Sequence, residues 1–229
     1  MQIKKIDDST WMLDDGFVRG YLLAGTEHAI LIDTCASSDE AKALAQSACR
    51  LPVVLVNTHG DGDHVAGNGA FDEFYMSEAD YIGCRMAERC PESKLLPLND
   101  GDVLDPGGRP LEIIAIPGHT LGSVAILDCK HRVLYSGDSV QDGHIYMFGE
   151  HRKPDAFAAS LEKLTALEGR FDCIRPAHGT PELPAAFVRT VADAWRRVQS
   201  GEVNGHSETL HGRMVMTYDA EGCGFYCGE

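Results

Sequence analysis

One arrangement recurs four times along this chain: an apolar run, two small or turn-forming residues, and then a side chain that can bind a metal ion. The runs are VVLV, IIAI, VLY and, more loosely, DCIR, and the side chains are His59, His119, Asp138 and His178. Such runs are typical of buried strands, and groups just past the carboxyl ends of strands gather at one sheet edge. One histidine after a strand usually indicates an ordinary loop residue, but four such positions predict a shared site in an α/β fold.

The first instance, residues 58–67 (THGDGDHVAG), is the richest. It places four potential ligands in six positions, His59, Asp61, Asp63 and His64, interleaved with two glycines that suit a tight loop around cations. A solvated Asp/Gly turn is the alternative, and the preceding strand disfavours it. A calcium loop would need oxygen donors throughout. Imidazoles mixed with carboxylates instead favour zinc, iron or manganese.

The rest of the chain predicts one mixed α/β domain spanning residues 1–229, because no Ser/Gly linker, charge block or low-complexity tract marks a boundary. The first third has the short, turn-separated runs of a strand meander. Helical periodicity follows, and Ser37 and Glu40 have capping-box spacing. The expected strands are 2–6, 10–13, 17–23 and 29–33, the expected helices are 37–50, 154–169 and 184–200, and strand-and-turn character without a clear period returns over 205–229.

Charge and composition exclude several classes of partner. The chain has 35 acidic and 20 basic residues and a formal net charge of −15, which disfavours binding to nucleic acid or anionic membranes. No apolar run approaches the length of a membrane span, and residues 1–10 lack an export signal, so a cytoplasmic protein is expected. The eight cysteines form no Cys-x-x-Cys pair and are expected to be free thiols. Cys223 and Cys227 remain an open case, and the sequence does not address the oligomeric state.

The ordered motifs His59-x-Asp61-x-Asp63-His64, His119, Asp138 and His178 resemble those of the metallo-β-lactamase-fold hydrolases over about residues 20–180. This superfamily includes glyoxalase II-like thioesterases, lactonases and flavodiiron proteins. The resemblance implies a four-layer αββα sandwich with two divalent metal ions between its sheets. It implies that His59, position 61 and His119 hold metal 1, that Asp63, His64 and His178 hold metal 2, and that Asp138 bridges the two metals. Asp33, which closes the strand 29–33, would hold a ligand without touching metal.

This chain departs from the family pattern at position 61, where Asp61 stands in place of the usual histidine. A third carboxylate, together with a hydroxide, brings the formal charge of two divalent cations to about zero, where the family usually keeps about one positive charge. Bound water is then acidified less and a carbonyl is polarised less. The oxygen donor also shifts the preference of metal 1 toward iron, manganese or magnesium and away from zinc.

The activity that the resemblance implies is metal-assisted hydrolysis of a small ester, thioester or lactone. A hydroxide bridging two cations about 3.5–4 Å apart would attack the carbonyl carbon, while the metals steady the oxyanion and the leaving group. Asp63 and Asp138 would orient the hydroxide. Asp61 is expected to serve as a weak base when it is not fully engaged with metal.

Two alternatives stay open. Flavodiiron proteins carry a carboxylate at the position of Asp61, and the 18 residues between His119 and Asp138 also match that group. A di-iron redox protein that reduces oxygen or nitric oxide is therefore the alternative function, although no flavodoxin domain or flavin site is evident. A silent scaffold used only for binding is disfavoured by the nearly intact ligand set. The metal content separates these hypotheses.

Substrate-binding residues are expected in the segment 139–153, which follows Asp138 and should overhang the metals. His144, Tyr146, Phe148 and Arg152 would line a pocket with an apolar wall and a cation for a substrate carboxylate. The hydroxyl of Tyr146 would be available to an oxyanion. Ordinary loop packing is the alternative for each of these residues.

Overall fold

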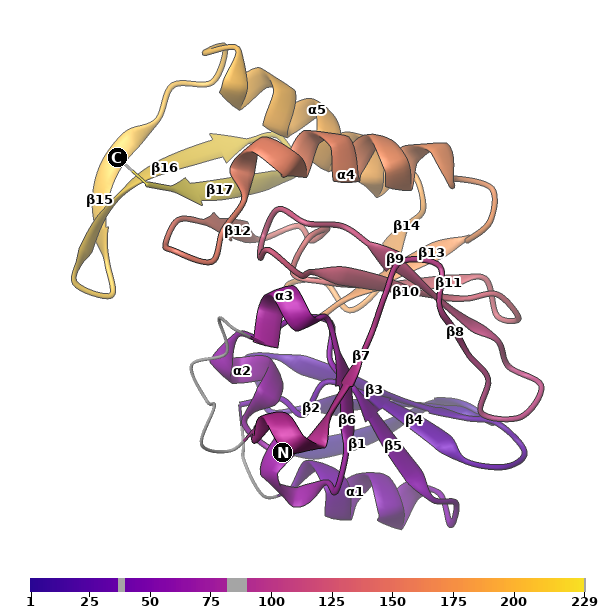
Figure 1. Ribbon diagram of the computed structural model, residues 1–229. Coiled ribbons are helices and arrows are strands. Elements are labelled where there is room, and N and C mark those ends of the chain that lie inside the picture. Colours follow the sequence, from indigo (N-terminus) through magenta and orange to yellow (C-terminus); the bar gives the residue numbers. More distant parts are fainter. Residues whose placement is uncertain (37–39, 82–89, 229) are drawn as a thin grey trace.

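The computed structural model describes residues 1–36, 40–81 and 90–228 (Figure 1). Its first sheet has seven strands in sequence order. The first four strands form an antiparallel meander, as the short runs of the sequence predict, and the last four are parallel. The strands are β1 (Gln2–Asp7), β2 (Thr10–Asp14), β3 (Arg19–Ala24), β4 (Ala29–Ile32), β5 (Val53–Val56), β6 (Phe74–Met76) and β7 (Leu95–Pro97).

A second sheet of six strands faces the first (Figure 1). Its order is β14-β13-β11-β10-β9-β8, and β11 and β13 run parallel. The strands are β8 (Val103–Leu104), β9 (Leu111–Ala115), β10 (Val124–Asp128), β11 (Val133–Gly137), β13 (Cys173–Pro176) and β14 (Leu183–Pro184). Buried side chains of both sheets, such as Ile30, Val56, Ile113 and Ile126, form one core between them.

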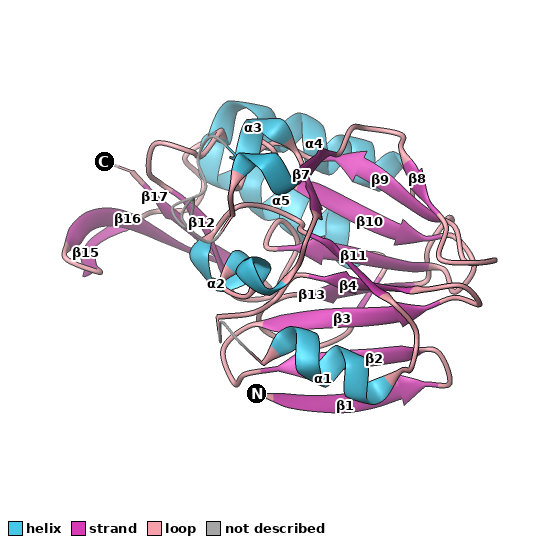
Figure 2. Cartoon of the chain, turned by 60° about the horizontal axis from the view of Figure 1, so that its bottom comes forward, coloured by secondary structure: helices cyan, strands magenta, loops and turns pink. Residues whose placement is uncertain are grey.

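Helices cover the two outer faces of this sandwich. Apolar side chains of α1 (Ala41–Ala48) pack on the outer side of the first sheet, and Figure 2 shows this helix lying across its strands. The helices α4 (Pro154–Ala166) and α5 (Phe187–Gln199) cover the second sheet through residues that include Phe157 and Trp195. The predicted four-layer αββα sandwich is therefore confirmed. Shorter helical turns are α2 (Gly62–Val65), α3 (Glu78–Tyr81) and two 3₁₀ turns, Asn68–Ala70 and Glu92–Lys94.

A third sheet lies beside the sandwich, in the order β12-β17-β16-β15 (Figure 1). It joins β12 (His144–Met147), which follows Asp138 along the chain, to the C-terminal strands β15 (His206–Leu210), β16 (Arg213–Ala220) and β17 (Cys223–Cys227). The sequence shows no clear period here because β15 is largely exposed on both faces. Cys223 and Cys227, the open case, are both free thiols on β17.

The boundaries of all three helices differ from the sequence prediction, and the helix expected over 154–169 ends at Ala166. The expected helix 184–200 begins only at Phe187, because Leu183 and Pro184 pair with β13 as a short strand. The helix expected over 37–50 spans Ala41–Ala48, and Glu40 precedes it without a side-chain cap. Ser37, the other half of the expected capping box, lies outside the described residues. No helix within the described ranges is long and apolar enough to cross a membrane.

Candidate metal centre

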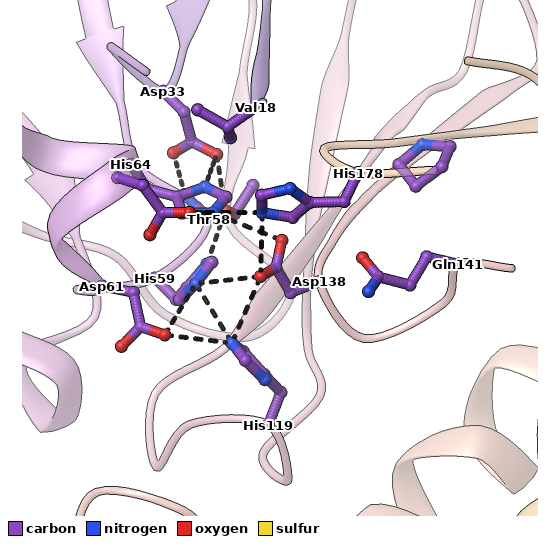
Figure 3. A network of polar contacts seen from close by, with 12 residues as sticks. Val18, Asp33, Thr58, His59, Asp61, His64, His119, Asp138, Gln141 and His178 are labelled. Carbon is purple, nitrogen blue, oxygen red and sulfur yellow. Dashed lines mark hydrogen bonds and ion pairs between the residues drawn. The ribbon is translucent and has the colours of Figure 1, made fainter. Parts of the chain in front are cut away.

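The metal-capable side chains meet at one edge of the two sheets (Figure 3). His59 follows β5, His119 follows β9, Asp138 directly follows β11 and His178 follows β13. The glycine-rich stretch after His59 is a helical turn rather than an open loop, because the backbone N–H of His64 donates to the carbonyl of Asp61 at 2.9 Å. Strands distant in sequence thus bring the predicted residues to one place.

Six of the side chains converge as two groups of three, and His59 and His64, one from each group, form a third close group with Asp138. In the first ligand group, His59, Asp61 and His119, an Asp61 carboxylate oxygen lies 3.7 Å from His59 Nε2 and 3.3 Å from His119 Nε2. In the second ligand group, Asp63, His64 and His178, an Asp63 oxygen lies 3.8 Å from His64 Nε2 and 3.3 Å from His178 Nε2.

Asp138 lies between the two groups (Figure 3). One of its oxygens is 3.6 Å from His119 Nε2, in the first ligand group, and 3.4 Å from His178 Nε2, in the second. Its other oxygen, Oδ1, is 3.3 Å from His64 Nε2. A single carboxylate therefore faces both groups, which is the placement expected of a bridging ligand.

Two buried polar atoms in the centre lack a hydrogen-bond partner among the described residues: His64 Nε2 and Asp138 Oδ1. They lie close together but without the alignment of a hydrogen bond. Leaving such atoms unpaired costs about 1–3 kcal/mol each, so buried polar atoms normally have partners. Both atoms are of a kind that binds divalent cations, and both point into the cluster. The donor set therefore fits metal ions.

Each candidate histidine ligand is oriented from its far side. Tyr146 O lies 2.9 Å from the Nδ1 of His119, and Phe17 O lies 2.9 Å from the Nδ1 of His178. When Nδ1–H donates to such an acceptor, the ring presents the Nε2 lone pair to the centre. His59 and His64 have equivalent partners, Thr58 Oγ1 at 3.0 Å and Asp33 Oδ2 at 2.9 Å.

Asp33 lies behind the ligands rather than among them. Its carboxylate accepts from the backbone N–H and hydroxyl of Thr58 at 2.8 and 2.7 Å, as well as facing His64 Nδ1. It follows β4 with a φ of 60°, a left-handed conformation that costs energy for a residue with a Cβ. Asp33 therefore joins His64 to the residue that orients His59. The resemblance implies such a position, behind the metal ligands, for Asp33.

The sequence pattern of the metallo-β-lactamase superfamily matches residues 13–83 and 84–204, most of the chain. The chain belongs to the metallo-β-lactamase superfamily. Solved structures agree in fold: a metallo-β-lactamase from Pontibacter korlensis has a TM-score of 0.70 at 20% identity, covering 85% of this chain and 98% of that one. The DIM-1 metallo-β-lactamase has a TM-score of 0.72 at 17% identity, covering 86% and 97%.

Two relatives carry the names of hydrolases. The human acyl-coenzyme A thioesterase MBLAC2 is 24% identical, with 76% of this chain and 80% of that protein covered. A hydroxyacylglutathione hydrolase of Francisella tularensis is 29% identical, with 74% of this chain and 64% of that protein covered. The chain is accordingly an enzyme of this hydrolase superfamily. The strands β15 to β17 lie beyond the stretch that the superfamily pattern matches.

Burial and charge oppose each other at the carboxylates of this superfamily site. Burial disfavours the ionised form of Asp138, but the charges of His64 and His178 outweigh it and hold its pKa well below the ordinary value. At Asp61 burial acts in the same sense, and polar contacts with His119 and His59 nevertheless lower its pKa. The carboxylates are therefore ionised, as metal ligands must be.

The pKa values of three of the imidazoles shift in two directions. Burial alone would lower the pKa of His178, but the Asp138 carboxylate raises it to about 10. His64 likewise has a pKa well above its ordinary value, because Asp138 and Asp33 outweigh its burial. The pKa of His119 is lowered, first by burial and then by the charge of Arg152. In the second ligand group, protons therefore occupy positions that cations would take.

Three of the residues expected to face the substrate, His144, Tyr146 and Phe148, contact other aromatic rings. Tyr146 and Phe148 stack with ring centroids 5.7 Å apart, and Tyr226 of β17 meets Tyr146 edge-on at 5.0 Å. His144 stacks on Tyr226 at 4.5 Å and has its Nε2 2.9 Å from Asp219. Tyr146 and Phe148 thus belong to an aromatic wall that begins beside His119, whereas His144 is paired with Tyr226 and Asp219 of its own sheet.

Arg152 has a protein partner in place of the substrate carboxylate expected for it. Its Nη1 and Nη2 donate to the two oxygens of Asp61 at 3.1 and 2.6 Å. The superfamily position that usually carries histidine is therefore filled here by an Asp–Arg pair. No sequence pattern indicates this pair, because the two residues are 91 positions apart.

Asp80 of α3 positions two of the loops around the centre, and no sequence motif indicates this role. One of its oxygens accepts from Gly60 N at 2.7 Å and from Thr120 Oγ1 at 2.8 Å, and the other accepts from Gly122 N at 2.6 Å. It therefore joins the backbone after His59 to the backbone after His119. Asp80 stands outside every metal-ligand spacing, so the sequence offered no signal for it.

We expect Asp80→Ala to weaken zinc binding by about 10–100-fold, as loss of a residue that orients metal ligands usually does. The reason is that both histidines of the first ligand group then lose a shared anchor. Zinc retained after dialysis against a chelator measures the effect. The exposed Glu78 on the same short helix provides the control, and Glu78→Ala should retain zinc as the unsubstituted protein does. Equal retention by both variants would contradict the positioning role.

Proposed function

We propose that this protein is a dinuclear metal-dependent hydrolase of small acyl thioesters. The observation that carries the proposal is the pair of three-residue ligand groups with Asp138 facing both. A centre of this kind serves hydrolysis without a serine or cysteine nucleophile. Thioesters are favoured over other esters and lactones because the two relatives named above are a thioesterase and a hydroxyacylglutathione hydrolase.

Two bound divalent ions would supply an acidified water molecule and a Lewis acid for the carbonyl oxygen. The protein's own residues prepare the place for them. The Nδ1 partners fix each imidazole with Nε2 inward, and Asp138 is positioned to accept a hydrogen bond from a water between the two groups and so to orient it. Asp63, whose pKa is lowered by His178 against the effect of burial, is an ionised acceptor on the second group.

Exposure indicates where a substrate approaches. The side chains of His59, His64 and His119 are at most 1% exposed, whereas those of Asp61 and Asp63 are 28% and 27% exposed. The centre is therefore closed by its histidines and open beside these two aspartates. A thioester carbonyl would enter from this side, with its carbonyl carbon toward the water that Asp138 orients.

The aromatic wall supports an acyl group of apolar character. Tyr146 and Phe148 stack, Tyr226 lies edge-on to Tyr146, and His211 stacks on Tyr146 with ring centroids 6.4 Å apart. The backbone of Tyr146 touches His119, so the wall begins at the first ligand group. Flat apolar rings gain contact energy from apolar chains laid against them. The substrate-facing roles of Tyr146 and Phe148 are part of this proposal.

The test is a panel of acyl-coenzyme A thioesters, a glutathione thioester, a lactone and a chromogenic β-lactam, each offered to protein loaded with zinc, manganese or iron. Loss of thioester absorbance is the better readout, because the chain's free cysteines would react with thiol reagents. We expect thioester cleavage that vanishes on metal removal. Cleavage of the lactone or lactam alone would overturn the thioester assignment.

A di-iron redox protein is the second candidate, favoured by the carboxylate at Asp61. Protein purified without added metal would then contain two irons, reduce oxygen or nitric oxide when supplied with electrons, and leave every thioester intact. This combination of results would replace the hydrolase proposal.

A further inference from the structure

Arg152 and Asp61 form a two-pronged ion pair at the edge of the first ligand group. Nη1 donates to Oδ1 at 3.1 Å and Nη2 donates to Oδ2 at 2.6 Å. The Arg152 side chain is only 13% exposed. A bidentate, largely buried arrangement of this kind fixes the plane of the carboxylate, unlike a single contact between mobile surface side chains.

The backbone on both sides of Arg152 is tied to the loop that carries His119. Lys153 N donates to Gly118 O at 2.8 Å, and Leu121 N donates to His151 O at 2.9 Å. Two hydrogen bonds thus join the segment to residues on either side of His119. The guanidinium and the imidazole are therefore positioned by the same piece of backbone.

The bidentate pair with Arg152 leaves one lone pair on each Asp61 oxygen, and only the one on Oδ2 faces the other candidate ligands of the first group. A carboxylate offers about four acceptor sites on its two oxygens, and the two N–H groups of Arg152 occupy one on each oxygen. Oδ2 also faces His119 Nε2 at 3.3 Å and His59 Nε2 at 3.7 Å. Oδ1 has no such neighbour among the described candidate ligands. Asp61 is thus held to present a single oxygen, as an imidazole presents a single nitrogen.

The charges lead to the same interpretation. A neutral histidine at position 61 would add no charge to the centre, whereas Asp61 adds one negative charge. Arg152 adds one positive charge within hydrogen-bond distance, so the pair sums to zero. The pair therefore has both the single donor atom and the net charge of the imidazole that the superfamily usually carries.

We propose that Asp61 and Arg152 act as one ligand unit, in which Arg152 is a positioning residue that aims Asp61 at the first metal ion. The proposal concerns metal binding and stands whether or not thioesters are the substrate. It replaces the role of Arg152 as a receptor for a substrate carboxylate.

The deciding variant is Arg152→Gln, studied by titrating metal-free protein with zinc in competition with a chromophoric chelator. If Arg152 aims the carboxylate, one of the two zinc ions should bind about 10–100-fold more weakly. If Arg152 contributes only its charge, removing a cation should make zinc bind more tightly. The two explanations therefore predict opposite signs. Unchanged or tighter binding overturns the proposal.

Three further variants sharpen the test. Arg152→Lys keeps the charge but not the planar fork, so it should weaken zinc binding nearly as much as Arg152→Gln. In an Asp61→His background, Arg152→Gln should no longer weaken binding, because no carboxylate needs to be aimed. Arg132→Gln removes a remote bidentate pair with Asp172 and should leave both zinc ions unaffected.

Circular dichroism and thermal midpoints of the metal-free proteins show whether each variant is folded. If Arg152→Gln does not fold, the comparison between Asp61→His and the double variant still decides the matter. Equal zinc affinities in those two proteins support the proposal. A loss on removing Arg152 from the Asp61→His protein contradicts it.

Discussion

Asp138→Ala should lower kcat/KM for the thioester by about 10³-fold or more, which corresponds to about 4 kcal/mol of transition-state stabilisation. It should also reduce the bound metal by at least one ion per chain. The reason is that Asp138 is the one described carboxylate that faces both ligand groups, within 3.6 Å of His119 Nε2 and 3.4 Å of His178 Nε2. Steady-state kinetics and elemental analysis measure the two effects.

The position of Asp138 is built into the end of β11. Gly137 precedes it with a φ of 53°, and a Cβ there would lie 2.8 Å from Thr58 Oγ1, which orients His59. Asp172→Ala, an exposed aspartate that only pairs with Arg132, is the matched control and should leave kcat/KM unchanged. Loss of less than tenfold in the Asp138 variant, with full metal content, would contradict the bridging role.

Removing the metals should destabilise the protein strongly. A ligand present at about 1,000 times its dissociation constant stabilises the folded state by about 4 kcal/mol, which shifts the thermal midpoint of a chain this size by about 8–16 °C. Without cations, the buried Nε2 of His64 and Oδ1 of Asp138 lie 3.3 Å apart and have no hydrogen-bond partner among the described residues. Thermal unfolding with and without a chelator measures the shift.

Restoring zinc should recover the thermal midpoint of the chelated protein. Asp138→Ala is the control, because its midpoint should respond little to the chelator. A midpoint that is the same with chelator, with zinc and with neither would contradict the presence of a stabilising metal centre.

Four of the candidate ligands could be predicted from sequence because each lies shortly after its own strand, and the other three share the stretch after His59. An apolar run that ends before His59, His119 or Asp138 is a local signal, and parallel or neighbouring strands bring such ends together. The fold follows from the same runs and from the order of motifs typical of the superfamily. The strand β15 could not be predicted in this way, because an exposed edge strand has no apolar face to impose a period.

The residues around the ligands could not be predicted, since their roles exist only in three dimensions. Asp80 joins two loops through three acceptor contacts, and nothing in its neighbouring sequence distinguishes it from a surface acid. Arg152 was expected to face substrate because its segment overhangs the site. The position of Asp61, whose carboxylate pairs with the Arg152 guanidinium, cannot be derived from the sequence of that segment.

Elemental analysis of protein purified without added metal shows whether this chain holds a dinuclear metal centre. A dinuclear centre bridged by Asp138 should hold about two divalent ions per chain, and Asp138→Ala should retain one or none under the same purification. Less than one ion per chain in the unsubstituted protein, persisting after supplementation with zinc, manganese and iron, would contradict it.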